Sequence, residues 1–304
     1  MCARILGAMS TSTSTPVAVV TGANSGIGRA TALHLAQHGY TVFGTVRSLN
    51  KADKLLAKAS ELGVTIELVE MDVADDDSVR TGFADIMRKV SHIDVLVNNA
   101  GIGGNGVTEE CTPAQYHESF NVNVVGAIRC TQQVLPGMRA RKTGTIINIT
   151  SIVGRIAALA QSPYVASKWA FEGVSEGLAQ EVAPFGIRVA IIEPGVTRSS
   201  IFSKNIEAPN STGAYDTHYR RMFQFYAAGI ANATPAEEVG ALILHAITTD
   251  TPQLRYPCSW GGQQIVEGRA AMTDEQWVEL GAVQDDPAYF EAFKSSFGVD
   301  ISNS

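Results

Sequence analysis

The chain has 304 residues, of which 45% are hydrophobic and 17% charged, and its formal net charge is −7 at pH 7. This composition is typical of a chain that buries a sizeable core. No dense cluster of Lys or Arg is present, which argues against nucleic-acid binding. No apolar run approaches the roughly 18 residues that a membrane-spanning helix needs, so we expect a cytoplasmic protein without a membrane partner.

The cysteines and histidines give no sign of a cross-linked or metal-bound fold. Cys2, Cys111, Cys130 and Cys258 lie far apart without a C-x-x-C pair, which indicates reduced thiols rather than a disulfide or zinc framework. The six histidines show no paired-ligand spacing, so we expect no bound metal.

Residues 1–16 are rich in Ser and Thr and predict a flexible leader rather than a signal peptide. From Val17 onward, short β-branched runs alternate with segments of helical periodicity. Strands are predicted at 17–21, 41–46, 65–70, 94–97, 144–149 and 187–193, with a seventh near 254–256. Helices are predicted at 27–38, 51–62, 76–90, 114–140, 164–184 and 236–248. This alternation predicts an α/β fold with a doubly wound parallel sheet, the Rossmann architecture.

We expect one domain over residues 17–257, with an insertion at about 199–235 that interrupts the alternation. A long insertion in such a domain is usually a lid or a binding segment. Residues 258–304 form a C-terminal extension with two weak helices, at 273–282 and 287–294.

A glycine-rich turn follows the first predicted strand and precedes the first helix. Gly22 permits a tight turn, Gly26 lets a diphosphate approach the backbone, and Gly28 lets the helix pack closely. The predicted dinucleotide contacts in this turn are Gly22, Asn24, Ser25, Gly26, Ile27 and Gly28. An ordinary glycine-rich turn is the alternative, although the strand and helix on either side favour a cofactor site.

The residues after the second strand bear on the choice of nicotinamide cofactor. An acidic residue there binds the ribose 2′-hydroxyl of NAD, whereas a basic residue pairs with the 2′-phosphate of NADP. This chain has Arg47 and Ser48 at that place and no acid before Asp53. We therefore expect NADP (NADPH), with a solvated surface arginine as the alternative.

Tyr164 and Lys168 lie four residues apart, which puts their side chains on one face of a helix. A nearby ammonium favours the phenolate and lowers the pKa of a tyrosine, and this makes Tyr164 a general acid and base. Ser151 stands thirteen positions before Tyr164, just past a predicted strand, where its hydroxyl can reach a carbonyl oxygen.

The turn T-G-x-x-x-G-I-G resembles that of the short-chain dehydrogenase/reductase family, and further motifs over residues 17–200 agree in order. The resemblance implies that Ser151, Tyr164, Lys168 and Asn123 are the catalytic set, with Asn121 as the rival to Asn123. Asn123 would support a water that links to Lys168, and Lys168 would also hold the nicotinamide ribose. The stretch from Phe120 to Gly195 looks most like the branch of retinol and 17β-hydroxysteroid dehydrogenases.

The same resemblance implies further cofactor contacts. Asn98 to Gly101 match the family's N-N-A-G and would lie on the adenosine side, while Asp72 and Val73 match its adenine pair. The segment after the sixth strand matches the Pro-Gly segment that binds the nicotinamide carboxamide. The contacts implied in this way are Asp72, Val73, Asn99, Ala100, Gly101, Pro194, Gly195, Val196, Thr197 and Ser199.

Aromatic residues gather at 201–226, where they either line a substrate pocket or only pack the lid onto the core. We place Gly103–Gly104, Asn105, Arg155–Leu159 and Ser162-Pro163 at the rim of that pocket. The sequence thus predicts an NADP(H)-dependent oxidoreductase that reduces a hydrophobic ketone or aldehyde, or oxidises the matching alcohol.

Two alternatives stay open, an NAD-dependent alcohol or hydroxysteroid dehydrogenase and a non-catalytic NADP-sensing protein on the same fold. The presence of Ser151, Tyr164 and Lys168 argues against the second. The family usually pairs its chains through the helices that correspond to 114–140 and 164–184, so a homodimer or homotetramer is expected.

Overall fold

A seven-stranded parallel sheet forms the centre of the computed structural model, which describes residues 15–199 and 208–302. The strand order is β3-β2-β1-β4-β5-β6-β7. The direction of winding reverses between β1 and β4, and in open α/β sheets ligands bind beyond the carboxyl ends of the strands at such a point. The predicted doubly wound parallel sheet is confirmed.

Each predicted strand is present, with ends shifted by at most two residues. The strands are β1 (Val17–Val20), β2 (Thr41–Val46), β3 (Ile66–Glu70), β4 (Val95–Asn98), β5 (Gly144–Ile149), β6 (Ile187–Pro194) and β7 (Arg255–Cys258). The helices that connect them are α1 (Gly26–Gln37), α2 (Asp53–Glu61), α3 (Asp76–Met87), α4 (Pro113–Phe120), α5 (Gly126–Arg141), α6 (Ser162–Val182) and α9 (Ala236–Thr248).

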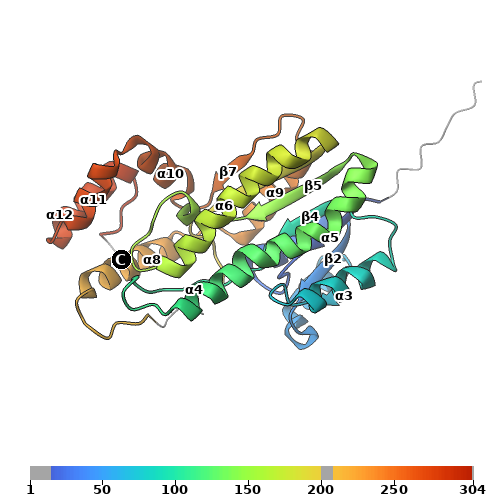
Figure 1. The fold of residues 1–304 in the computed structure, drawn as a ribbon, viewed down its shortest axis with the longest axis horizontal. Coiled ribbons are helices and arrows are strands. Elements are labelled where there is room, and N and C mark those ends of the chain that lie inside the picture. Colours follow the sequence, from blue (N-terminus) through green and yellow to red (C-terminus); the bar gives the residue numbers. More distant parts are fainter. Residues whose placement is uncertain (1–14, 200–207, 303–304) are drawn as a thin grey trace, which may run out of the picture.

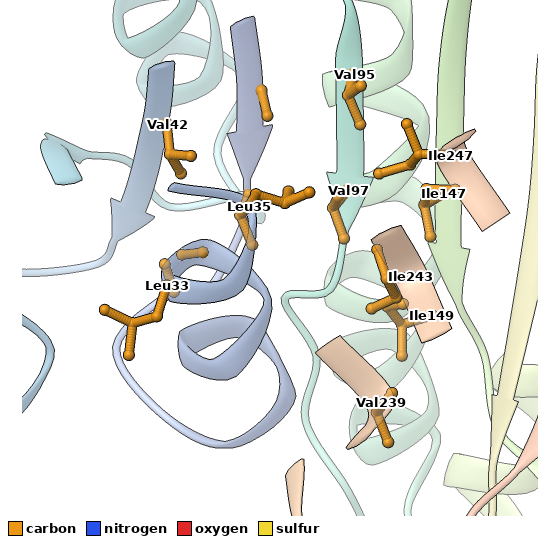
Figure 2. Packing of buried hydrophobic residues seen from close by; sticks show 14 of the residues in the cluster. Leu33, Leu35, Val42, Val95, Val97, Ile147, Ile149, Val239, Ile243 and Ile247 are labelled. Carbon is orange, nitrogen blue, oxygen red and sulfur yellow. The ribbon is translucent and has the colours of Figure 1, made fainter. Parts of the chain in front are cut away.

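Helices cover both faces of the sheet, because successive strand residues point to opposite sides. Ala18 and Val20 of β1 face a core under α1 and α9. Figure 2 shows Leu33 on the α1 side of that core and Val97, Ile147 and Ile243 on the α9 side. The alternate residues, such as Val19 and Leu96, face a second core under α3, α5 and α6. Burial on both faces explains why the strands read as continuous apolar runs.

The C-terminal extension packs on the domain rather than standing apart from it. It contains α10 (Gly262–Ala271), α11 (Asp274–Ala282) and α12 (Asp286–Phe297), which lie together at the end of the molecule near α8 (Figure 1). Phe293 and Phe297 belong to a third cluster with Ile152, Val153 and Ile156, which follow β5. Helix α8 (Asp216–Ala231) lies within the predicted lid.

Three helical regions differ from the prediction, and one of them is α8, because no helix was predicted within the lid. The helix expected at 114–140 is divided into α4 and α5 by a π-helical turn at Asn121–Val125, a feature often found at functional sites. Helix α10 was not predicted, because apolar residues give it little helical periodicity. Residues 1–14 of the predicted leader and residues 200–207 of the predicted lid are outside the described residues.

Within the described ranges, Cys111, Cys130 and Cys258 are free thiols, and burial raises the pKa of Cys130 to about 12. None of the helices described has both the length and the apolar character needed to cross a bilayer.

Candidate active site

The glycine turn adopts the backbone that its sequence predicts. Gly22 and Gly26 have φ of +66° and +52°, a region that residues with a side chain rarely occupy. A Cβ at Gly28 would lie 2.3 Å from Asn99 Nδ2 and 2.5 Å from the Gly22 carbonyl oxygen. Gly28 therefore permits close contact with the end of β4, rather than only the helix–strand packing expected from sequence.

The N-terminus of α1 opens at this turn. Ser25 is its N-cap without a side-chain capping bond to the helix, and the first turn contains no acidic residue. The first backbone N–H groups and the positive end of the helix dipole therefore suit a diphosphate. Glycines without side chains and a helix end without acids fit the predicted dinucleotide.

Thr21 and Asn99 tie this turn to the end of β4. The Asn99 amide donates to the carbonyl oxygens of Thr21 at 2.8 Å and Gly22 at 3.3 Å. Thr21 Oγ1 accepts from the backbone N–H groups of Asn99 and Ala100, both at 2.9 Å. Asn98 is instead buried and donates to Thr131 and Asn148 across the sheet. The N-N-A-G segment thus shapes the glycine turn, a role that the sequence analysis missed.

Arg47 and Ser48 follow β2 directly, beside the same turn, because the Ala23 N–H donates to the Thr45 carbonyl at 3.0 Å. Arg47 is exposed, and across residues 15–199 and 208–302 it forms no ion pair. Asp72 uses its carboxylate to accept from the Ala74 N–H at 2.9 Å, and Val73 packs against Gly126. Asp72 and Val73 therefore end β3 in a fixed turn.

The segment after β6 is held by the loop after β7. The N–H groups of Gly195 and Val196 donate to the carbonyls of Cys258 at 2.8 Å and Trp260 at 3.0 Å. Thr197 Oγ1 is bonded to Ser259 Oγ at 2.7 Å. Gly26 faces Ser199, since a Cβ on the glycine would lie 3.0 Å from the Ser199 Cβ. This segment, which begins at Pro194, thus closes toward the glycine turn.

Ser151, Tyr164 and Lys168 meet at the carboxyl end of β5. Ser151 lies two residues after the strand, and its hydroxyl donates to the Pro194 carbonyl at 3.3 Å. Lys168 Nζ donates to the Ile149 carbonyl at 2.9 Å and lies 5.7 Å from the centroid of the Tyr164 ring. Because α6 begins at Ser162, both Tyr164 and Lys168 lie on its first two turns.

Burial controls the charges in this group. Burial raises the pKa of Tyr164 to about 12, while a hydrogen bond with the Ser151 side chain acts to lower it. Burial lowers the pKa of Lys168 to about 8, against the opposing effect of Glu172. The expected lowering of the Tyr164 pKa by the ammonium is not found, because desolvation of the phenol is the larger effect. Tyr164 is therefore protonated at neutral pH.

Asn123 lies in the π-helical turn and is 1% exposed. Its side chain pairs with the backbone of Ile102, accepting from the N–H at 2.8 Å and donating to the carbonyl at 2.9 Å, and it also donates to Ser167 Oγ. Asn121 points toward α3 and α5, where it contacts Ala74 and Arg129. Asn123 is thus the asparagine on the Lys168 side, and its link through a water stays a prediction.

The residues predicted at the pocket rim make contacts of different kinds. Tyr226 of α8 donates to Asn105 Oδ1 at 2.8 Å. Burial, with a smaller effect of the nearby Tyr164, raises the pKa of Tyr226. Ser162 is bonded to Thr108 and Tyr116. Ala158 and Leu159 pack in the third cluster. Arg155, by contrast, forms an ion pair with Glu193 at 3.3 Å, so its role is electrostatic.

Sequence reasoning missed the buried glutamates Glu172 and Glu193 near Lys168. The signal available was the position of Glu172, four residues after Lys168 and therefore on the same helix face. Glu193 and its partner Arg255 could not be found in this way, because they come from the last two strands of the sheet.

Residues 16–210 match the family model described as short chain dehydrogenase. The chain belongs to the short-chain dehydrogenase family.

Three relatives show the range of the similarity. An uncharacterized oxidoreductase, YusZ, of Bacillus subtilis is 36% identical and covers 87% of this chain and 96% of its own. The 3-ketodihydrosphingosine reductase of Bacteroides thetaiotaomicron is 34% identical over 79% of this chain and 86% of its own. Mouse 17-beta-hydroxysteroid dehydrogenase type 1 is 34% identical, over 79% of this chain and 72% of the mouse protein.

Solved structures agree with the fold. A short-chain dehydrogenase from Streptomyces avermitilis has a TM-score of 0.78 at 35% identity, covering 90% of this chain and all of its own. A metagenomic short-chain oxidoreductase in complex with NADP has a TM-score of 0.65 at 26% identity, and the match covers 80% of this chain and 96% of the oxidoreductase chain.

Proposed function

We propose that this short-chain oxidoreductase uses NADP(H) to reduce a hydrophobic ketone or aldehyde, with Tyr164 as the general acid. The observation that carries the proposal is the meeting of Tyr164, Ser151 and Lys168 at the carboxyl end of β5, beside the glycine turn. A bound NADPH would supply hydride to the carbonyl carbon.

The protein's residues supply the proton and hold the reacting oxygen. Tyr164, with a pKa near 12, carries its proton at neutral pH and is ready to donate it to the developing alkoxide. Ser151 gives up its long bond to Pro194 and donates to the same oxygen, where negative charge forms. Lys168 stabilises the tyrosinate left behind. The protonated phenol favours reduction over alcohol oxidation at neutral pH.

Arg47 supports the choice of NADP. Its guanidinium stands at the end of β2 without an ion-pair partner in the described part of the chain, and it offers a planar fork suited to a 2′-phosphate. The metagenomic relative that contains NADP adds support at the level of the family. The alternative is an NAD-dependent alcohol or hydroxysteroid dehydrogenase.

A hydrophobic substrate is supported by the side chains around Tyr164. The third cluster brings Leu159, Phe225 and Trp260 to the same region as the Tyr164 ring. Two of the relatives carry the names of enzymes for lipid-like ketones or alcohols, a ketosphingoid base and a hydroxysteroid. The retinol and 17β-hydroxysteroid branch therefore stays within the proposal.

The test is a screen of aliphatic, steroid and retinoid carbonyl compounds in which NADPH absorbance is followed, with NADH in parallel. We expect turnover of at least one hydrophobic carbonyl and tighter binding of NADPH. Equal or tighter binding of NADH would refute the NADP assignment. Absence of turnover in the presence of a bound cofactor would favour the non-catalytic alternative.

We also propose a homodimer or homotetramer, paired through α5 and α6. Trp169 and Val174 of α6 are 49% and 37% exposed, and Val125, just before α5, is 39% exposed. Light scattering of the purified protein tests this, and a monomer at all concentrations would refute it.

A further inference from the structure

Four charged side chains form a network behind Lys168, on the side of β6 and β7. Its members are Glu172 of α6, Glu193 of β6, Arg155 after β5 and Arg255 of β7. Glu172 and Glu193 are 5% and 1% exposed. The reaction proposed above does not use this glutamate–arginine network, although it lies next to the catalytic lysine.

Glu172 is fixed from two sides. Its Oε1 accepts from Thr150 Oγ1 at 2.5 Å, and its Oε2 accepts from Arg255 Nε at 3.0 Å. Thr150 lies between Ile149, whose carbonyl accepts from Lys168, and Ser151. Three consecutive residues at the end of β5 thus hold the lysine, hold the glutamate and provide the serine hydroxyl.

Close packing keeps this arrangement from shifting. A Cβ at Gly154 would lie 2.9 Å from Glu172 Cγ and 3.0 Å from the Lys168 carbonyl oxygen. The loop after Ser151 therefore presses directly on the helical turn that joins the two residues. A side chain at position 154 would therefore collide with the helical turn that carries Lys168 and Glu172.

The two buried glutamates of the network differ in their effect on Lys168. Nζ faces the rings of Tyr164 and Phe171, at 5.7 and 5.8 Å from their centroids, and the Ile149 carbonyl. The negative charge that opposes its desolvation comes from Glu172, one helical turn away. Glu193 lies further back, between Arg155 at 3.3 Å and Arg255 at 3.4 Å. Glu176 pairs with Nη2 of Arg255, whereas Glu172 and Glu193 pair with its Nε, and the Glu176 side chain is 53% exposed.

We propose that Glu172 is a positioning residue for the catalytic lysine: held by Thr150 and Arg255, its carboxylate keeps the Lys168 ammonium charged beside Tyr164. Only the effect of Glu172 on catalysis rests on the proposed function. The effect on Lys168 itself is a property of the folded chain.

The test follows the titration of Lys168 by NMR in protein with isotope-labelled lysine, without cofactor or substrate, and the signal is assigned by its loss in Lys168→Arg. We expect a midpoint near 8 in the wild type. In Glu172→Gln, which keeps the shape and removes the charge, the midpoint falls by about one pH unit. The charge of Glu172 helps to raise the pKa of Glu193 to about 7, so Glu172→Gln lowers that pKa. Glu193 is then mostly ionised at the Lys168 midpoint of both proteins and offsets little of this change.

Glu176→Gln is the matched control, because it removes an exposed carboxylate from the same arginine. Its Lys168 midpoint stays within about 0.2 pH unit of the wild type, since solvent screens that charge. An unchanged midpoint in Glu172→Gln, or an equal shift in Glu176→Gln, would overturn the proposal. If Glu172→Gln does not fold, Thr150→Val replaces it, because the carboxylate is then no longer held at the end of β5. A smaller shift in the same direction supports the proposal and an unmoved midpoint refutes it.

Once a carbonyl substrate is known, the alkaline limb of kcat/KM should move to lower pH in Glu172→Gln by the same amount. Loss of the ammonium removes the active protonation state at a lower pH. A shifted Lys168 midpoint without any NADPH-dependent turnover would refute the proposed function and leave the role of Glu172 standing. NADPH-dependent turnover with an unshifted Lys168 midpoint would support the proposed function and refute the role of Glu172.

Discussion

The carboxyl edge of the sheet and the region of α8 with α10–α12 are built in different ways. At the edge, polar residues such as Ser151 and Asn99 come one or two positions after a strand and are held by nearby backbone. In the second region, aromatic side chains and Arg221 join segments distant in sequence. Arg221 is 2% exposed, donates to Asp286 at 2.8 Å and lies 4.0 Å from the centroid of the Tyr289 ring. Local motifs therefore set the chemistry, whereas long-range packing sets what surrounds it.

The largest effect is expected at the edge, from Tyr164→Phe. This variant loses the proton donor, so kcat should fall by about 10²- to 10⁴-fold. NADPH affinity and the melting temperature should change little, because the ring still packs in the third cluster. Steady-state kinetics and cofactor titration check this, and turnover close to the wild type would contradict the catalytic role.

In the second region, Arg221→Met should lower the free energy of unfolding by about 2–3 kcal/mol. It leaves the carbonyls of Val283 and Gln284 without their donor and removes the link between α8 and the extension. Because α8 carries Tyr226 toward Tyr164, KM for the carbonyl should rise more than kcat falls. Chemical denaturation and kinetics measure both.

Arg220→Met is the control, since Arg220 binds the same Asp286 carboxylate from a half-exposed position. It should shift the unfolding midpoint far less than Arg221→Met. Equal effects of the two substitutions would mean that charge on Asp286, rather than burial of Arg221, ties the regions together.

A smaller effect is expected from Arg47→Ala, which removes the proposed partner of the 2′-phosphate. NADPH binding should weaken by about tenfold, while NADH binding stays unchanged. Calorimetric titration with both cofactors checks this. An equal loss of affinity for NADH would show that Arg47 does not bind the 2′-phosphate.

A further effect is a pH dependence of stability from Glu193. Burial and the charge of Glu172 raise the pKa of Glu193 from its ordinary 4.5 to about 7, so the folded protein binds more protons than the unfolded chain between these values. This contribution to stability is full below pH 4.5 and is lost as pH rises through 7. Glu193→Gln should therefore melt higher than the wild type at pH 8 and less so at pH 5. A difference that does not depend on pH would contradict this.

The sequence was sufficient for the parts of the molecule that repeat a local pattern. Strand positions followed from β-branched runs, and the places of Gly22 and Ser151 followed from their positions after those strands. The place of Tyr164 followed from its helical spacing to Lys168. The pKa of Tyr164 could not be predicted, because desolvation depends on side chains such as those of the extension. Arg255 and Glu193 meet Glu172 only when β6 and β7 join the sheet. The short apolar pattern of α10 likewise does not reveal its contacts.

The hydrogen bonds between the segment after β6 and the loop after β7 determine when, during synthesis, the chain can first bind a nicotinamide ring. The backbone of Gly195 and Val196 is held by Cys258 and Trp260, which leave the ribosome much later. A nascent chain that already contains the serine, tyrosine and lysine therefore lacks the support for its expected carboxamide site. Competence to bind a nicotinamide ring should arrive only with the final strand, so shortened translation products should be inert.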